Sequence, residues 1–115
     1  MIQKYLKRFP YAFAGIWHAL RNDFSFKWQV IGIGFFLAGF VLFMWPLTQI
    51  ELLAIGLSYT FILITELQNS SFEAALDRLH PEIHDDIGRS KDMAAGAVLL
   101  AAFFMVFVLV MIVLY

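Results

Sequence analysis

Two uncharged apolar runs, residues 28–45 and 93–114, dominate the hydrophobic pattern of the chain. Each is long enough to cross the hydrocarbon core of a bilayer, about 30 Å thick, as an α-helix. Trp28 and Trp45 bracket the first run at positions typical of the aromatic belts of membrane proteins, and Pro46 ends it. The pattern therefore predicts two transmembrane helices at these positions.

A third apolar stretch, residues 52–65, is too short to span a bilayer alone and runs directly into Glu66. Neither Gly nor Pro follows Gly56 before Pro81, so nothing interrupts a helix in this region. We therefore predict one long helix over residues 52–79, which spans the membrane and then projects into the cytoplasm.

The N-terminal region follows a different pattern. Residues 5–20 carry apolar side chains at helical spacing, with Lys7, Arg8 and His18 off the apolar stripe and Pro10 near the start. This pattern favours an amphipathic surface helix in the membrane interface over a packing helix inside the bundle. The predicted fold is a single-domain, all-α integral membrane protein, residues 1–115, with three transmembrane helices and an N-terminal amphipathic surface helix.

Composition supports this class and excludes others. Of the 115 residues, 62% are hydrophobic and only 15% are charged, compared with about 25% charged in an ordinary soluble domain. The formal net charge of -1 offers no basic surface for nucleic acid. The chain has no cysteine, which excludes disulfides and thiolate metal sites. We expect no removable signal peptide.

The distribution of cations predicts the orientation. All eight Lys and Arg residues precede the first span or lie between the second and third spans, and the turn at residues 46–51 has none. Because Lys and Arg are retained on the cytoplasmic side, we expect a cytoplasmic N-terminus and an external C-terminus at Tyr115. We expect the membrane to be the bacterial inner membrane.

Polar residues that follow the apolar part of the long helix form one acidic face. At about 100° per residue, this face spans an arc of roughly 100° and contains Glu66, Asn69, Ser70, Glu73 and Asp77. A helix emerging into water would explain Asp77 but not Glu66, which follows the apolar run directly. Ionised groups inside a bilayer cost a few kcal/mol at the least and usually mark a functional site.

This face suits phosphoryl transfer. Carboxylates with an amide between them are the oxygen ligands that Mg²⁺ takes, and one dry carboxylate could be a general base. The loop between the second and third spans would supply donors to phosphate from His80, His84, Arg89 and Lys91. A rival interpretation makes a metal site of His80, Glu82, His84 and Asp85. The stretch Gly88–Lys91 lacks the spacing of a P-loop.

The order of these residues resembles the prokaryotic diacylglycerol kinase family, which includes the undecaprenol kinases. The resemblance covers most of the chain. It rests on Tyr11-x-x-x-Gly15, Asn22-Asp23-x-x-Phe26-Lys27, Glu66-Leu-Gln-Asn69-Ser70-x-x-Glu73-x-x-x-Asp77-Arg78, His84 and Gly88-Arg89-x-Lys91-Asp92.

The resemblance implies an ATP-dependent lipid kinase: a homotrimer with active sites shared between neighbouring subunits. By position, Glu66 is expected to be the catalytic base, with Asn69 beside it. Asp23 and Glu73 are expected to bind Mg²⁺. The residues expected on the nucleotide or its metal are Tyr11, Asn69, Glu73, Asp77, His84, Gly88, Lys91 and Asp92, with Lys91 on phosphate and Asp92 near the adenine or ribose.

Some positions depart from the family pattern. Asp23 replaces a usual Glu and is one methylene shorter, and Gln29 replaces a usual acid. The motifs around Asp77 and Gly88 resemble the diacylglycerol kinase branch, whereas residues 94–98 resemble the undecaprenol kinases. We expect diacylglycerol as the lipid alcohol, with undecaprenol as the alternative.

Two functions of other classes compete with a lipid kinase. One is a non-enzymatic membrane subunit whose polar face grips a partner helix. The other is an ion path along the acidic face, which would need polar residues continuing to the far side. Residues 52–64, which lead from Glu66 toward the far side, offer only Ser58, Tyr59 and Thr60.

Overall fold

A computed structural model of the protein describes residues 1–82 and 84–115, and these residues form helices and connecting turns. The helices are α1 (Ile2–Leu6), α2 (Phe9–Asn22), α3 (Phe24–Trp28), η1 (Gln29–Ile33), α4 (Gly34–Met44), α5 (Gln49–Leu79) and α6 (Asp85–Leu114). The element η1 is a π-helical turn that joins α3 to α4 in one continuous rod. The predicted all-α fold is confirmed.

Three helical segments are long and apolar enough to cross a membrane: Phe24–Met44, Gln49–Leu79 and Asp85–Leu114. At 1.5 Å per residue, the latter two are each about 45 Å long, which exceeds the hydrocarbon core by about 15 Å. The prediction of one uninterrupted helix to Leu79 is confirmed, as is the end of the first span before Pro46. The chain is therefore a multi-pass membrane protein.

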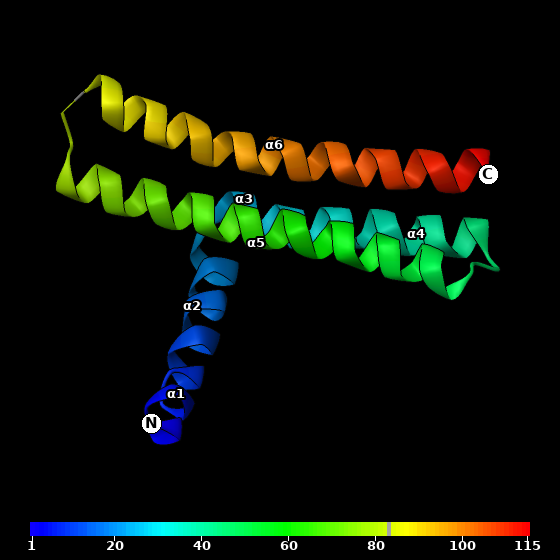
Figure 1. Ribbon diagram of the computed structural model, residues 1–115, viewed down its shortest axis with the longest axis horizontal. Coiled ribbons are helices and arrows are strands. Elements are labelled where there is room, and N and C mark those ends of the chain that lie inside the picture. The colour runs from blue at the N-terminus through cyan, green and yellow to red at the C-terminus, as the bar shows by residue number, and fades with distance from the viewer. Residues whose placement is uncertain (83) are drawn as a thin grey trace.

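Helix α2 leaves the three spans at a steep angle (Figure 1). Pro10 lies in its first turn, where a missing backbone N–H costs no helical hydrogen bond. No residue of α2 is buried within one copy of the chain. An exposed amphipathic helix that turns away from the spans agrees with a position in the membrane interface rather than inside the bundle.

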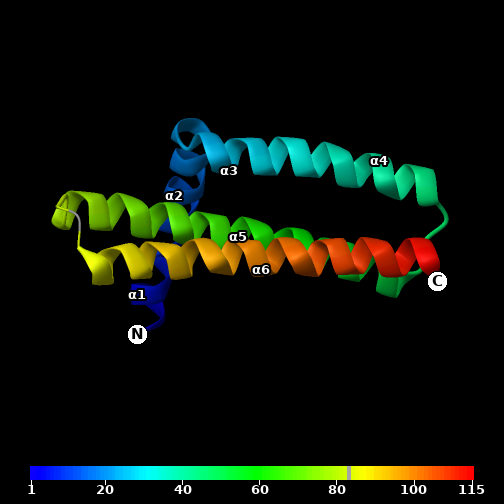
Figure 2. The ribbon, with the colours of Figure 1, turned by 90° about the horizontal axis from the view of Figure 1, so that it is seen from above.

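Helices α5 and α6 run antiparallel and side by side, and α3 and η1 lie against α5, whereas α4 runs farther from it (Figures 1 and 2). The buried core joins all three spans through Leu37 of α4, Ile55 of α5, and Val108 and Ile112 of α6. Only 11%, 22% and 17% of the residues in the most apolar part of the three spans are buried within one copy. Most of the apolar surface therefore faces outward.

Candidate active site

Helix α5 carries the acidic face at the end of its apolar part. Glu66 is buried, with only 5% of its surface exposed, whereas Glu73 and Asp77 further along the helix are exposed. Glu66 is covered because α3 and η1 pack against α5 at this level. The buried Glu66 carboxylate is thus shielded from water next to two solvent-exposed carboxylates, as expected from the sequence.

Two further carboxylates lie near Glu66. Asp23 and Glu73 both lie close enough to repel its charge. Asp23 sits at the junction of α2 and α3, where its Oδ1 accepts a hydrogen bond of 3.2 Å from the Phe26 backbone N–H and caps α3. The buried Phe26 ring anchors the same turn. The fold thus brings Asp23 to the acidic face although they are far apart in sequence.

The carboxylate oxygens near Glu66 are of the kind that magnesium prefers as ligands. Carboxylates from Asp23 and Glu73 supply the charge that Mg²⁺ favours, and the ion usually completes its shell with water and phosphate oxygens. Asn69 Oδ1 is buried and accepts no hydrogen bond from the described residues. Across residues 1–82 and 84–115, no three His, Asp or Glu side chains lie close enough together to hold a metal ion. That includes His80, Glu82, His84 and Asp85.

A lysine lies on the other side of the acidic face. Lys91 of α6 donates a hydrogen bond of 2.5 Å to Asp77 Oδ1 of α5. The ammonium group is also close enough to Glu73 to interact with its charge. The pair places one cation beside the predicted metal ligands, where a phosphate would need it.

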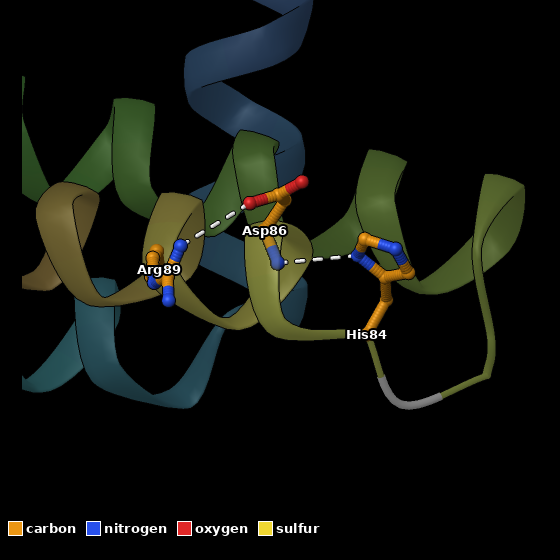
Figure 3. Close-up of polar contacts among 3 residues, drawn as sticks. All are labelled: His84, Asp86 and Arg89. Carbon is orange, nitrogen blue, oxygen red and sulfur yellow. Dashed lines mark hydrogen bonds and ion pairs between the residues drawn. The ribbon is translucent and has the colours of Figure 1, made fainter.

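The first turn of α6 is built around His84 (Figure 3). Its Nδ1 accepts a hydrogen bond of 3.1 Å from the Asp86 backbone N–H and so caps the helix, while Arg89 pairs with Asp86 at 3.4 Å. The expectation that Arg89 and Lys91 lie in a loop is wrong, because α6 begins at Asp85. The Asp85 and Asp86 carboxylates stabilise this start of the helix.

The earlier start of α6 has a consequence for the predicted nucleotide residues. Gly88, Lys91 and Asp92 are spaced three and four positions apart on a helix, so they share one face, and His84 lies one turn before them. Gly88 has open space around its Cα. The predicted nucleotide residues of α6 thus form one continuous row.

A groove of about 620 Å³ lies between α2 and α5. It is lined by Tyr11 and Gly15 of α2, by Asp23, and by Ser70 and Ser71 of α5, among others. Tyr11 is itself largely exposed. The groove joins one predicted nucleotide residue, Tyr11, to one predicted metal ligand, Asp23.

One copy of the chain brings the predicted residues together in two groups. The Asp23 and Glu73 carboxylates lie near enough to act on the charge of Glu66, and Glu73 also acts on Lys91, which pairs with Asp77. The helix that carries Tyr11 and the helix that carries Lys91 extend on different sides of α5 (Figures 1 and 2). A single copy therefore presents the predicted nucleotide residues on two separate surfaces.

One residue beside the site and one supporting residue were not predicted from the sequence. Gln29 is a departure from the family pattern, and its side-chain amide lies near enough to the Glu66 carboxylate to interact with it. The Tyr59 hydroxyl donates a hydrogen bond of 2.6 Å to the Val30 carbonyl. A tyrosine inside an apolar span needs a partner for its hydroxyl, and that need was the available signal.

The remaining hydroxyls of α5 do not continue a polar path through the membrane. Ser58, Thr60 and Thr65 each donate to a backbone carbonyl of α5 itself, with shortest distances of 2.9, 2.7 and 2.8 Å. The polar groups of the site thus gather at one end of the spans, which disfavours an ion path. Fold and site together define a membrane-embedded protein with a one-sided acidic site and an adjoining cation.

Comparison with known proteins identifies the family. The profile of the prokaryotic diacylglycerol kinase family matches residues 10–113. The diacylglycerol kinase of Escherichia coli K12 is 31% identical over 100 residues, which cover 84% of this chain and 77% of that protein. The diacylglycerol kinase of Haemophilus influenzae is 30% identical over 97 residues, which cover 79% and 75%. The chain belongs to this family and is a lipid kinase, as predicted.

Proposed function

We propose that the protein transfers a phosphoryl group from magnesium ATP to diacylglycerol, which gives phosphatidic acid. The observation that carries the proposal is the burial of Glu66 at the edge of the apolar span, with the Asp23 and Glu73 carboxylates near enough to act on its charge. That depth is where the hydroxyl of a lipid headgroup would lie. The relatives from Escherichia coli and Haemophilus influenzae are diacylglycerol kinases by name, which supports diacylglycerol as the acceptor.

In this mechanism each residue has a separate task. Glu66 takes the proton from the attacking hydroxyl, and burial keeps water away from it. Asp23 and Glu73 would hold magnesium with Asn69 nearby, and such an ion would supply positive charge for the phosphate oxygens. Lys91 adds a second positive charge, and the row of α6 with Tyr11 of α2 receives the nucleotide.

We further propose that the working unit is a homotrimer. The outward apolar surface of the spans and the placement of predicted nucleotide residues on two sides of α5 support it. A neighbouring copy that brought its α6 to the groove between α2 and α5 would join the two surfaces. Helix packing of this kind is driven by close contact and polar groups rather than by water exclusion.

The acceptor can be tested directly. The purified protein is incubated with magnesium ATP and, separately, with diacylglycerol and undecaprenol, and the phosphorylated lipid is quantified. We expect diacylglycerol to be phosphorylated to phosphatidic acid faster than undecaprenol is phosphorylated. Faster phosphorylation of undecaprenol would contradict the proposed substrate while leaving the lipid kinase class intact.

The orientation makes a separate prediction. All eight Lys and Arg residues lie at one end of the spans: in residues 4–27, at Arg78 in the last turn of α5, and at Arg89 and Lys91 near the start of α6. This end is therefore expected in the cytoplasm of a bacterial cell, with the spans in its inner membrane. A reporter fused after Tyr115 should report an external position, and one fused before Met1 a cytoplasmic position. A cytoplasmic signal from the Tyr115 fusion would contradict this orientation and place the active site outside.

A further inference from the structure

The π-helical turn η1 lies at the level of the buried carboxylate. A π-helical turn takes more residues than an α-helical turn, so it changes the direction in which side chains before it point relative to those after it. Such turns are uncommon and often occur at functional sites. Here the turn begins at Gln29, the residue that faces Glu66.

In the contact between Gln29 and Glu66, the donor and the acceptor can be assigned. A carboxylate only accepts hydrogen bonds, so the Gln29 amide nitrogen must be the donor. Gln29 Oε1 is buried and accepts no hydrogen bond from any described residue, which leaves the amide nitrogen as the group of Gln29 that can bond to Glu66. An amide donor holds the carboxylate in one position without removing its ability to accept a proton.

Tyr59 fixes the backbone next to Gln29. Its hydroxyl donates to the carbonyl of Val30 at 2.6 Å, while the Gly34 N–H donates to the same carbonyl. Tyr59 lies two helical turns before Glu66 on α5, so the bond ties the two segments together close to the base. In a span, no water competes for such a bond.

Gly34 leaves the space that this hydroxyl occupies. A Cβ atom at Gly34 would lie 3.0 Å from the Tyr59 hydroxyl oxygen, so a side chain there would push the hydroxyl away. The bond from Tyr59 to the π-helical turn therefore depends on the absence of a side chain at Gly34.

We propose that Tyr59 is a positioning residue for Glu66, which it influences by holding the π-helical turn and thereby the Gln29 amide. This inference rests on the proposed role of Glu66 as the base. Tyr59 and Gly34 lie outside the motifs on which the family resemblance rests.

The test is steady-state kinetics of Tyr59→Phe in lipid vesicles. Deleting the hydroxyl keeps the ring and frees the turn, and small misplacements of a catalytic group cost up to about 100-fold in rate. We expect kcat to fall by about 10- to 100-fold with the KM for ATP unchanged. Thr60→Val is the matched control, because the Thr60 hydroxyl bonds only within α5; its kcat should stay within about twofold of wild type.

Coupling separates positioning from a general packing role. Gln29→Ala should lower kcat at least as much as Tyr59→Phe, and adding Tyr59→Phe to it should lower kcat no further. Gly34→Ala, which keeps Tyr59 but crowds its hydroxyl, should reproduce the loss if Tyr59→Phe fails to insert. The inference would be overturned if the fold-losses in kcat of Gln29→Ala and Tyr59→Phe multiplied in the double variant. It would also be overturned if kcat were unchanged in both Tyr59→Phe and Gly34→Ala.

The same experiment distinguishes this inference from the proposed function. If Glu66→Gln is inactive while Tyr59→Phe turns over normally, only the positioning role of Tyr59 is wrong. If Glu66→Gln itself turns over normally, the proposed base is wrong and the positioning role has no target.

Discussion

Glu73→Gln is expected to lower lipid phosphorylation at ordinary magnesium concentrations by at least about 100-fold, since loss of even an outer-sphere partner of a metal costs 10- to 100-fold. Glutamine keeps the volume and an oxygen of the side chain but removes its charge. Glu73 is exposed on α5 between buried Glu66 and the Asp77–Lys91 pair. Its charge is thus placed to hold a cation between the base and the lysine.

A magnesium titration measures this effect. The concentration that gives half-maximal rate should rise in Glu73→Gln, while insertion and assembly stay as in wild type. Two controls accompany it: Glu82→Gln removes an exposed charge paired only with His80 and should be silent, and Asp23→Glu, which lengthens a proposed ligand to the family's usual residue, should remain active. Near wild-type turnover of Glu73→Gln at ordinary magnesium would contradict its role as a ligand.

The three spans could be predicted because their signal is composition over a known length. Uncharged apolar runs and the helix ending at Leu79 follow from the thickness of the bilayer and the absence of Gly and Pro. The start of α6 was placed eight residues too late, because the polar residues before Met93 were interpreted as loop. A histidine cap followed by two aspartates begins this helix, and caps act locally without an apolar pattern.

The acidic face was predictable because its residues share one helix. Periodicity alone places Glu66, Asn69, Glu73 and Asp77 on one side of α5. Asp23 was identified only through the family resemblance, since its meeting with Glu66 depends on how α3 packs on α5.

The support of Glu66 by Gln29 and Tyr59 could not be predicted from periodicity. A π-helical turn has no repeat of its own in the sequence, and it breaks the 3.6-residue register that would otherwise locate its side chains. The bond from Tyr59 to Val30 joins residues 29 positions apart. Such contacts depend on tertiary packing, and a hydrophobic pattern does not specify which individual side chains meet.

Glu66→Gln is expected to lower turnover by about 100- to 10,000-fold, the usual effect of losing a general base. Glutamine keeps the volume and can still bond to Gln29, but it cannot take a proton from the attacking hydroxyl. The protein mainly positions groups and neutralises charge in phosphoryl transfer, so nucleotide affinity, measured separately by titration, should change little.

The control for Glu66→Gln is Glu51→Gln on the same helix. Glu51 lies at the opposite end of α5, where its carboxylate accepts the Thr48 N–H in a capping box, a bond that glutamine can also accept. Turnover of Glu51→Gln should therefore match wild type. Preserved turnover in Glu66→Gln would make Glu66 a structural residue, because a buried carboxylate that can lose its charge without kinetic effect takes no proton from the lipid. Loss of insertion or assembly in Glu66→Gln would instead assign its charge to the stability of the bundle.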